Sequence, residues 1–128
     1  MADAVEHFAA SVALAPGSAA AHFNLGTALA FAGRTEEAIA EYRRALEIGP
    51  GYALAHNNLG ALLLHRGDLD GALAQLQQAV ALDPGNADAQ DNLARAYDQR
   101  GEGALAERHS AQAARLRGGS QAGAEPQR

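Results

Sequence analysis

Apolar residues recur along this chain at helical spacing, in stretches of about fourteen residues that stop at glycine or proline. Within residues 53–86, for example, Leu59 and Leu63 belong to one apolar stripe that ends at Gly67, and a second stripe ends before Pro84. Three- and four-residue spacing places such side chains on one face of a helix. The pattern predicts seven helices and no strand. Their expected ranges are 2–15, 19–32, 35–48, 53–66, 69–82, 87–100 and 103–116.

The stops and the stripes repeat every 34 residues. This interval separates Pro16, Pro50 and Pro84, Gly33, Gly67 and Gly101, Leu25, Leu59 and Leu93, Ala38, Ala72 and Ala106, and Asn24, Asn58 and Asn92. A fixed period of 20–50 residues is typical of a repeat array, in which one supersecondary unit stacks on the next. Small residues such as Gly60 and Ala72 are expected where the two helices of a unit cross closely.

The repeated positions resemble the tetratricopeptide repeat (TPR) family. The residues that match are Leu25, Gly26, Ala38, Tyr42, Ala45 and Pro50, then Leu59, Gly60, Ala72, Leu76, Ala79 and Pro84, and then Leu93, Ala94, Tyr97, Gly101, Ala106 and Ala113. The resemblance implies an all-α fold, an α-solenoid that winds as a right-handed superhelix. It comprises an N-terminal half repeat (2–18) and three complete repeats (19–52, 53–86 and 87–117). Residues 118–128 follow the array of 1–117 and are expected to form a disordered tail.

Composition narrows the class of partner. The net charge is −5 and all ten basic residues are arginine, which argues against nucleic acid, whose binding depends on neutralised phosphates. The absence of lysine also argues against the carboxylate clamp with which some TPR proteins grip chaperone C-termini. The sequence contains neither an apolar run of 18 residues nor a visible signal peptide. The prediction is a soluble, cytoplasmic protein without a membrane span.

No constellation of residues indicates catalysis. His22 and His56 occupy equivalent positions of successive repeats, and a helix spacing of roughly 8–10 Å is too wide for two imidazoles to share one metal. A packing role is expected for both. The glycines Gly101 and Gly103 lack the strand and the further glycine of a dinucleotide-binding loop. The sequence therefore predicts a protein that is not an enzyme and holds no cofactor and no metal.

In the resembled family the first helix of each repeat lines a concave groove. By register, the candidate peptide-binding residues are Phe23, Asn24, Thr27, Phe31, Leu54, Asn57, Asn58, Ala61, His65, Asp91, Asn92 and Arg95. The three equivalent asparagines would form a ladder whose amides donate to and accept from the backbone of an extended ligand. This ladder resembles that in the TPR region of the O-linked N-acetylglucosamine transferase family. The alternative is that the asparagines only support local packing or hydration.

The expected groove is asymmetric. One part is apolar, with Phe23, Phe31, Leu54 and Leu64, and the other carries Asp88, Asp91 and Asp98 around Arg95. A ligand with apolar anchors and one or two basic residues would fit both parts. Alternatively, Asp88 favours the start of its helix while Asp91 and Asp98 pair with Arg95 along the helix.

The function that this reading predicts is a protein-interaction scaffold that binds a protein or peptide partner in its groove. Two alternatives stay open: an accessory module of a larger enzyme such as a glycosyltransferase, or a purely structural element of an assembly. The apolar stripe of the first helix, including Val5 and Phe8, would lack its usual partner helix. That stripe predicts either a longer native chain or end-to-end pairing of two copies through this helix.

Overall fold

The computed structural model describes residues 2–124 and contains seven helices in this range, as the pattern predicts. They are α1 (Ala2–Leu14), α2 (Ala19–Phe31), α3 (Thr35–Ile48), α4 (Ala53–Arg66), α5 (Leu69–Leu82), α6 (Ala87–Gln99) and α7 (Gly103–Ala124). The helices pair as α2 with α3, α4 with α5 and α6 with α7. The three pairs are the three complete repeats, and α1 is the second helix of a half repeat. The all-α solenoid is thereby confirmed.

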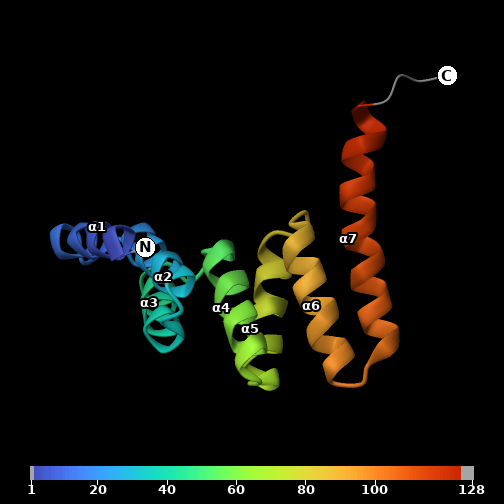
Figure 1. The fold of residues 1–128 in the computed structure, drawn as a ribbon. Helices are drawn as coiled ribbons and strands as arrows, with labels where there is room; N and C mark the ends of the chain where they lie inside the picture. The colour runs from blue at the N-terminus through green and yellow to red at the C-terminus, as the bar shows by residue number, and fades with distance from the viewer. Residues whose placement is uncertain (1, 125–128) are drawn as a thin grey trace.

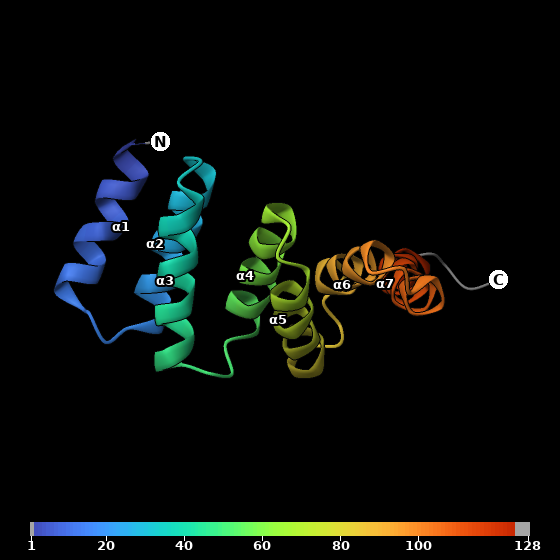
Figure 2. The ribbon, with the colours of Figure 1, turned by 90° about the horizontal axis from the view of Figure 1, so that it is seen from below.

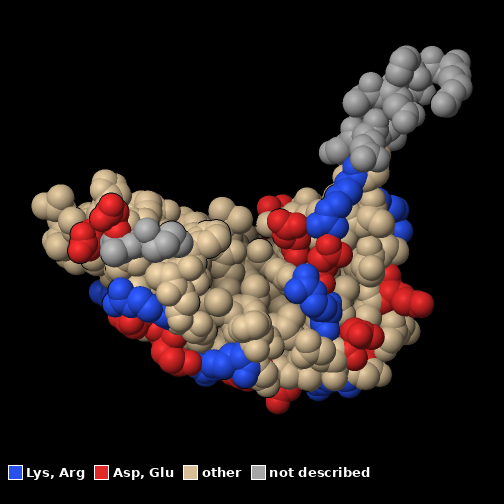
Figure 3. Space-filling model, viewed as in Figure 1, with Lys and Arg blue, Asp and Glu red and all other residues tan. Residues whose placement is uncertain are grey.

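The helices follow one another in a curved row rather than around one centre. Each packs chiefly on its neighbours in the chain, and α4 also reaches α6 (Figures 1 and 2). The arm of α1–α3 and the arm of α6 and α7 stand at opposite ends of the row, with α4 and α5 between them (Figure 1). A hollow therefore lies between the two arms (Figure 3).

Side-chain caps start a helix in each repeat. The backbone N–H of Ala21 donates to Ser18 Oγ at 3.1 Å, and that of Ala89 donates to Asn86 Oδ1 at 3.1 Å. At the start of α5, Asp68 Oδ1 accepts from the N–H of Gly71 at 3.0 Å. Each cap satisfies a donor that the first helical turn leaves unpaired.

Left-handed glycines end the first helix of every repeat. Gly33, Gly67 and Gly101 have φ angles of +79°, +91° and +85°. At this geometry the next N–H returns to a carbonyl five residues earlier, for example from Asp68 to Leu63 O at 2.9 Å. Glycine adopts positive φ without the steric penalty of a Cβ atom. A glycine that recurs every 34 residues thus allows the same turn between the paired helices of each repeat.

The closest crossings occur where the sequence predicts them. A Cβ atom added to Gly60 would lie 2.5 Å from Leu76 Cγ, and one added to Gly26 would lie 2.9 Å from the ring of Tyr42. Both partners are almost fully buried. They belong to a continuous core whose largest fully buried side chains are Tyr42, Leu59, Leu63, Leu76 and Leu93.

The last helix is longer than predicted. It extends to Ala124 instead of ending near residue 116, and so enters the range 118–128 that the sequence assigns to a tail. Gly118 and Gly119 each weaken a helix by about 1 kcal/mol relative to alanine. However, no proline lies between Gly103 and Pro126 to end the helix. Residues 125–128 lie outside the described residues, where the prediction of a tail stays untested.

The first helix is better covered than its sequence suggests. Val5 is only 9% exposed and belongs to the core, while Phe8 and Val12 are half-buried against it. The expectation that Val5 and Phe8 are both uncovered is therefore wrong for Val5, which packs in the core, whereas Phe8 is only half-buried. The large apolar side chain that α1 leaves exposed is Leu14, at 88%.

Candidate functional site: the inner face of the array

We use the term inner face for nine of the exposed and half-buried residues of α2, α4 and α6 that the sequence assigns to the groove. They are Phe23, Asn24, Thr27, Phe31, Asn58, Ala61, His65, Asn92 and Arg95. In Figure 3 the hollow is largely free of charged groups over α2 and α4, whereas acidic and basic groups gather over α6 and α7. The asymmetry predicted from the sequence is present in the structure.

Four of the predicted residues meet in one pocket at the N-terminal end. This pocket, the first apolar pocket, has a volume of about 340 Å³. It is lined by Ala4 and Phe8 of α1 and by Phe23, Asn24, Thr27, Ala28 and Phe31 of α2. The half repeat completes one wall of this pocket, because Phe8 of α1 supplies an aromatic ring. Tyr42 of α3 supplies the equivalent ring one repeat later.

A second pocket lies one repeat further along. This second apolar pocket has a volume of about 270 Å³ and is lined by Thr27, Ala30 and Phe31 of α2, Tyr42 of α3, and Asn58, Ala61 and Leu62 of α4. Thr27 and Phe31 belong to both pockets. Phe31 is 78% exposed and forms the partition between them.

Aromatic contacts hold the walls of the second pocket. The ring centroid of Phe23 is 5.7 Å from that of Tyr42 and 4.9 Å from that of Tyr52. The Tyr42 hydroxyl lies 2.8 Å from Thr27 Oγ1, which itself donates to the carbonyl oxygen of Phe23 at 3.1 Å. Burial raises the pKa of Tyr52, so this phenol is neutral near pH 7. These contacts give the pocket a fixed shape.

Two of the three predicted residues of α6 lie at a third, charged pocket. Asp91 and Arg95 line it together with Ala94, Asp98, Gly103, Ala106, Glu107 and Ser110, and its volume is about 680 Å³. These positions correspond to the surface of the first repeat on which α4 packs. The third pocket is therefore the place where the first helix of a further repeat would lie, and polar side chains cover it.

Arg117 neutralises part of this acidic end. Its guanidinium donates to Asp88 at 2.8 Å and also to Asp91. The hydrogen bond with Asp91 is the largest cause of a raised pKa at Arg117. The predicted pairing of Asp91 with Arg95 is wrong, because α7 continues far enough to bring Arg117 over the start of α6.

Several predicted residues stand apart from the pockets. Leu54 is 48% exposed and His65 is exposed, but neither lines one of the three pockets. Asn57 is buried at 7% exposure, and its Oδ1 accepts from Asn92 Nδ2 at 3.0 Å. Leu64, expected in the apolar part of the groove, is 6% exposed and belongs to the core instead.

The three equivalent asparagines have different surroundings. Asn24 is exposed at the first apolar pocket. Asn58 is half-buried, and its amide donates to the Tyr42 hydroxyl at 3.3 Å. Asn92 is tied to Asn57. Because a primary amide has two N–H groups and an acceptor oxygen, each of the three keeps hydrogen-bonding capacity for a ligand.

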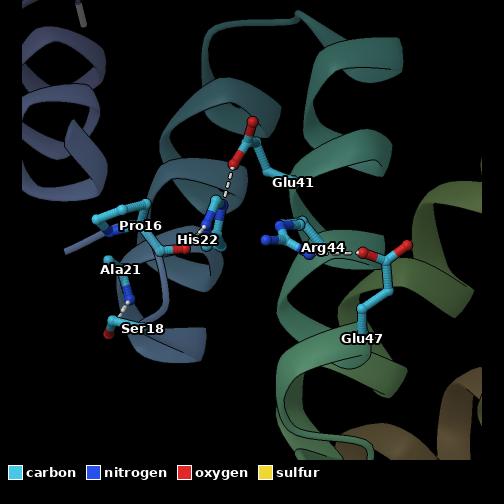
Figure 4. A network of polar contacts seen from close by, with 7 residues as sticks. All are labelled: Pro16, Ser18, Ala21, His22, Glu41, Arg44 and Glu47. Atoms are coloured by element: carbon cyan, nitrogen blue, oxygen red, sulfur yellow. Dashed lines mark hydrogen bonds and ion pairs between the residues drawn. The ribbon is translucent and has the colours of Figure 1, made fainter.

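The buried side chains of His22 and His56 each contact the loop before their own helix and the second helix of the repeat. The Nε2 atom of His22 lies 2.8 Å from the carbonyl oxygen of Pro16, and Nδ1 lies 2.7 Å from Glu41 Oε1 on α3 (Figure 4). The two ring nitrogens thus connect α2 to the preceding loop and to α3. His56 makes the same pair of contacts with Pro50 O and Gln75 Oε1, each at 2.8 Å.

The third repeat makes this contact with its side chains exchanged. Gln90, at the position of the two histidines, donates to the carbonyl oxygen of Pro84 at 3.0 Å. His109 of α7 lies 2.8 Å from Gln90 Oε1 and stacks on Tyr97. We call these three contacts the latches. The partners Glu41, Gln75 and His109 were not predicted, although they also lie 34 positions apart.

Within residues 2–124, no group of three or more histidine, cysteine, aspartate or glutamate side chains is placed to hold a metal ion. None of the helices that the structure describes combines the length and apolar character needed to cross a membrane.

Family models agree with the repeats seen in the structure. Two models described as tetratricopeptide repeat match residues 1–53 and 32–76, and one described as TPR repeat matches residues 62–101. The fold, the period and these matches define one class: the chain is a tetratricopeptide repeat protein. A comparison with curated proteins gave no match.

Solved structures with this fold include MamA. One crystal structure of MamA is 26% identical and has a TM-score of 0.84, with 94% of this chain and 70% of that chain covered. A second, titled as the crystal structure of MamA protein, is also 26% identical and has a TM-score of 0.82, with coverages of 98% and 68%. The likeness extends over nearly the whole of this chain and supports a scaffold rather than an enzyme fold.

Proposed function

We propose that this protein is an interaction scaffold whose inner face binds an extended peptide, or an extended segment of a protein partner. TPR proteins bind protein partners, and the family relationship supports this class of function. The observation that carries the more specific proposal is the pair of apolar pockets one repeat apart, each with an equivalent asparagine at its edge.

The asparagines would bind the ligand main chain while the pockets receive its side chains. An extended chain has a reach of roughly 3.3 Å per residue, so we expect an extended ligand of about six to nine residues to pass all three first helices. Asn58 lies at the centre of this path. Its amide oxygen and second N–H are the groups that would pair with one peptide unit.

The test begins with selection of binders on the full chain from a phage-displayed library of random twelve-residue peptides. The affinity of a selected peptide is then measured by calorimetry. Asn58→Ala should weaken binding about fivefold, because one net hydrogen bond contributes on the order of 1 kcal/mol. The melting temperature should change little, since the Tyr42 hydroxyl keeps its contact with Thr27.

Gln78→Ala is the matched control, because Gln78 is an exposed amide on α5 outside the inner face. It should leave affinity unchanged. Loss of folding in Asn58→Ala without a specific loss of affinity would favour a packing role for the asparagines. Failure to select any peptide would contradict the proposed function and favour a structural element or an accessory module of an enzyme.

Pairing of two copies through α1 is a separate prediction. Burial of Val5 removes part of the apolar surface from which it was argued. Size-exclusion chromatography with light scattering tests it. A strict monomer at high concentration, unchanged by Phe8→Glu, would exclude this mode of pairing.

A further inference from the structure

The third pocket lies on a surface that a following helix covers in the second repeat. There α6 packs on both α4 and α5. Three residues of the pocket have counterparts in the second repeat that are between 3% and 7% exposed: Asp91, Asp98 and Glu107 correspond to Asn57, Leu64 and Leu73. Asn57 also accepts a hydrogen bond from Asn92 of α6. The pocket therefore matches a surface that binds a helix elsewhere in the array.

The described chain does not turn back over this surface. The second helices α3 and α5 end at Ile48 and Leu82, and each is followed two residues later by a proline that cannot continue the helix. In the last repeat Gly118 stands in this proline position, and α7 continues to Ala124. Figure 1 shows α7 as the outermost helix of the row, rising past the others. The helix that would cover the pocket therefore has to be supplied by a partner.

The floor of the third pocket has space for a large apolar side chain. In the first two repeats Tyr42 and Leu76 fill the crossing of the paired helices beside a glycine. Ser110 takes their position in the last repeat and is exposed. Ala94 and Ala106 lie beside it in a pocket of about 680 Å³. We call the space above these three small side chains the gap. A leucine or phenylalanine side chain that enters the gap would be removed from water.

Two carboxylates lie one helical turn from the gap. Asp98 follows Ala94 by four residues on α6, and Glu107 precedes Ser110 by three residues on α7. Because α6 and α7 run in opposite directions (Figure 1), both carboxylates lie toward the turn that joins these helices. The gap and the acidic pair are therefore separated by about the distance between side chains three or four positions apart on one face of a helix.

Charge favours a basic partner at this site. Arg117 neutralises Asp91, whereas none of the ion pairs among the described residues includes Asp98, Glu107 or Arg95. These three leave two negative charges and one positive charge at the pocket. The α1 helix of a second copy would not complement them, because α1 carries two acidic residues and no arginine.

We infer that the third pocket is a docking site for an amphipathic helix of a partner protein. This helix places a large apolar side chain in the gap and an arginine or lysine, three or four positions away, at Asp98 and Glu107. An apolar centre with a charged rim is the usual composition of a protein interface. The site goes beyond the proposed function, since it does not depend on peptide binding in the two apolar pockets.

A library of helical peptides gives the first test. A helix of about fourteen residues, or four turns, is displayed on phage within a fixed two-helix scaffold, and the positions on its outward face are randomised. Selection uses the full chain. The selected helices should share a large apolar residue and an arginine or lysine three or four positions apart. Selected helices without this pair would overturn the inference.

The size of the gap gives the second test. A selected helix should bind about tenfold or more tightly than the same helix with its apolar anchor changed to alanine. Ser110→Leu gives the last repeat the residue of the second and fills the gap, so this preference should fall below about threefold. Ala74→Leu adds the same side chain at an exposed position of α5 and should leave the preference unchanged. Circular dichroism checks that both variants fold. An unchanged preference in Ser110→Leu would overturn the inference.

The acidic pair gives the third test. The double variant Asp98→Asn with Glu107→Gln should weaken binding of a selected helix about two- to fivefold, as for exposed ion pairs, and the difference should vanish at 1 M salt. Asp3→Asn with Glu6→Gln removes the same charge from exposed residues of α1 and should leave affinity unchanged. An equal loss in both double variants would assign the effect to net charge and overturn the role of the acidic pair.

The outcomes separate this site from the inner face. Selected helices that lose affinity with Phe31→Ala but not with the third-pocket variants would bind at the apolar pockets, and this result would overturn the inference. A dimer in light scattering that a selected helix dissociates would assign the pocket to a second copy of the chain instead. If no helix is selected, the docking site fails, whereas the proposed function still depends on its own library of unconstrained peptides.

Discussion

The first and last complete repeats have the same backbone plan but present different surfaces. At the helix crossing the two repeats have the same residue types: leucine at Leu25 and Leu93, and alanine at Ala38 and Ala106. Residues that line the pockets differ at nearly every equivalent position. Phe23, Thr27, Ala30 and Tyr42 of the first repeat correspond to Asp91, Arg95, Asp98 and Ser110 of the last.

The difference teaches that the core positions of Leu25 and Ala38 keep their residue types while pocket-lining positions vary, and that Tyr42 belongs to both sets. The first repeat uses Tyr42 to fill the crossing beside Gly26 and to support α4. The last repeat has the smaller pair Ala94 and Ser110, and polar groups cover the side where a further helix would pack. The first repeat thus supports the packing of a further helix and lines an apolar pocket, whereas the last repeat presents polar groups at the equivalent positions.

Tyr42→Ser would give the first repeat the residue of the last, and it should have the largest effect on stability. Tyr42 is 1% exposed, and truncation of a buried aromatic side chain typically costs 3–5 kcal/mol. Urea unfolding followed by circular dichroism would measure the loss. Ser110→Ala, at the equivalent exposed position, is the control and should change stability by less than about 0.5 kcal/mol. A similar effect of both changes would refute the assigned difference between the repeats.

Gly60→Leu tests the close crossing in the middle repeat. The new side chain would overlap Leu76, so overpacking should lower the free energy of unfolding by about 1–3 kcal/mol. Thermal unfolding would show a lower melting temperature. Ala74→Leu places the same side chain at an exposed position of α5 and should be close to neutral. A neutral result for Gly60→Leu would mean that the helix register is wrong.

The latches can be exchanged between repeats. His56→Ala leaves the carbonyl of Pro50 and the amide of Gln75 without their partner and should destabilise by about 1–3 kcal/mol. The double variant His56→Gln with Gln75→His reproduces the arrangement of the last repeat. It should recover most of that stability in urea unfolding. A double variant no more stable than His56→Ala would show that the two latch types are not equivalent.

The smallest expected effect is a pH dependence of the last latch. Burial first, and Arg108 second, lower the pKa of His109. The unfolded state therefore binds more protons near pH 6, so this contribution to stability is present above about pH 6.5 and is lost as the pH falls. Melting temperatures between pH 7.5 and 5.5 should fall less in His109→Gln than in the native chain. An equal fall in both would assign the pH dependence to other groups.

The helices and turns could be predicted because their signals are local. The positive φ of Gly67 and the close crossing of Gly60 with Leu76 follow from residue types that recur in register. The end of α7 could not be predicted, because the loss of helix stability at Gly118 and Gly119 competes with contacts between residues distant in sequence. Arg117 meets Asp88 and Asp91 across more than 25 positions, and no periodic pattern indicates that contact.

The candidate site shows the same limit. Register alone placed Phe31, Thr27 and Asn58 on one face, and the structure brings them together. It also placed Leu64 and Asn57 there, but both are buried. A helix position near the edge of a stripe turns inward or outward according to how its neighbour tilts, and tilt depends on packing rather than on period.

The chain-neighbour packing of α1 has a consequence for motion. Among the described helices, α1 rests chiefly on α2, so it can detach without disturbing the pairs that follow it. Yet Ala4 and Phe8 of α1 complete the first apolar pocket. A ligand in this pocket would contact both α1 and α2. It would therefore oppose the detachment of α1 from α2. Binding would then be seen as slowed amide hydrogen exchange in α1, and local ordering would become part of the affinity.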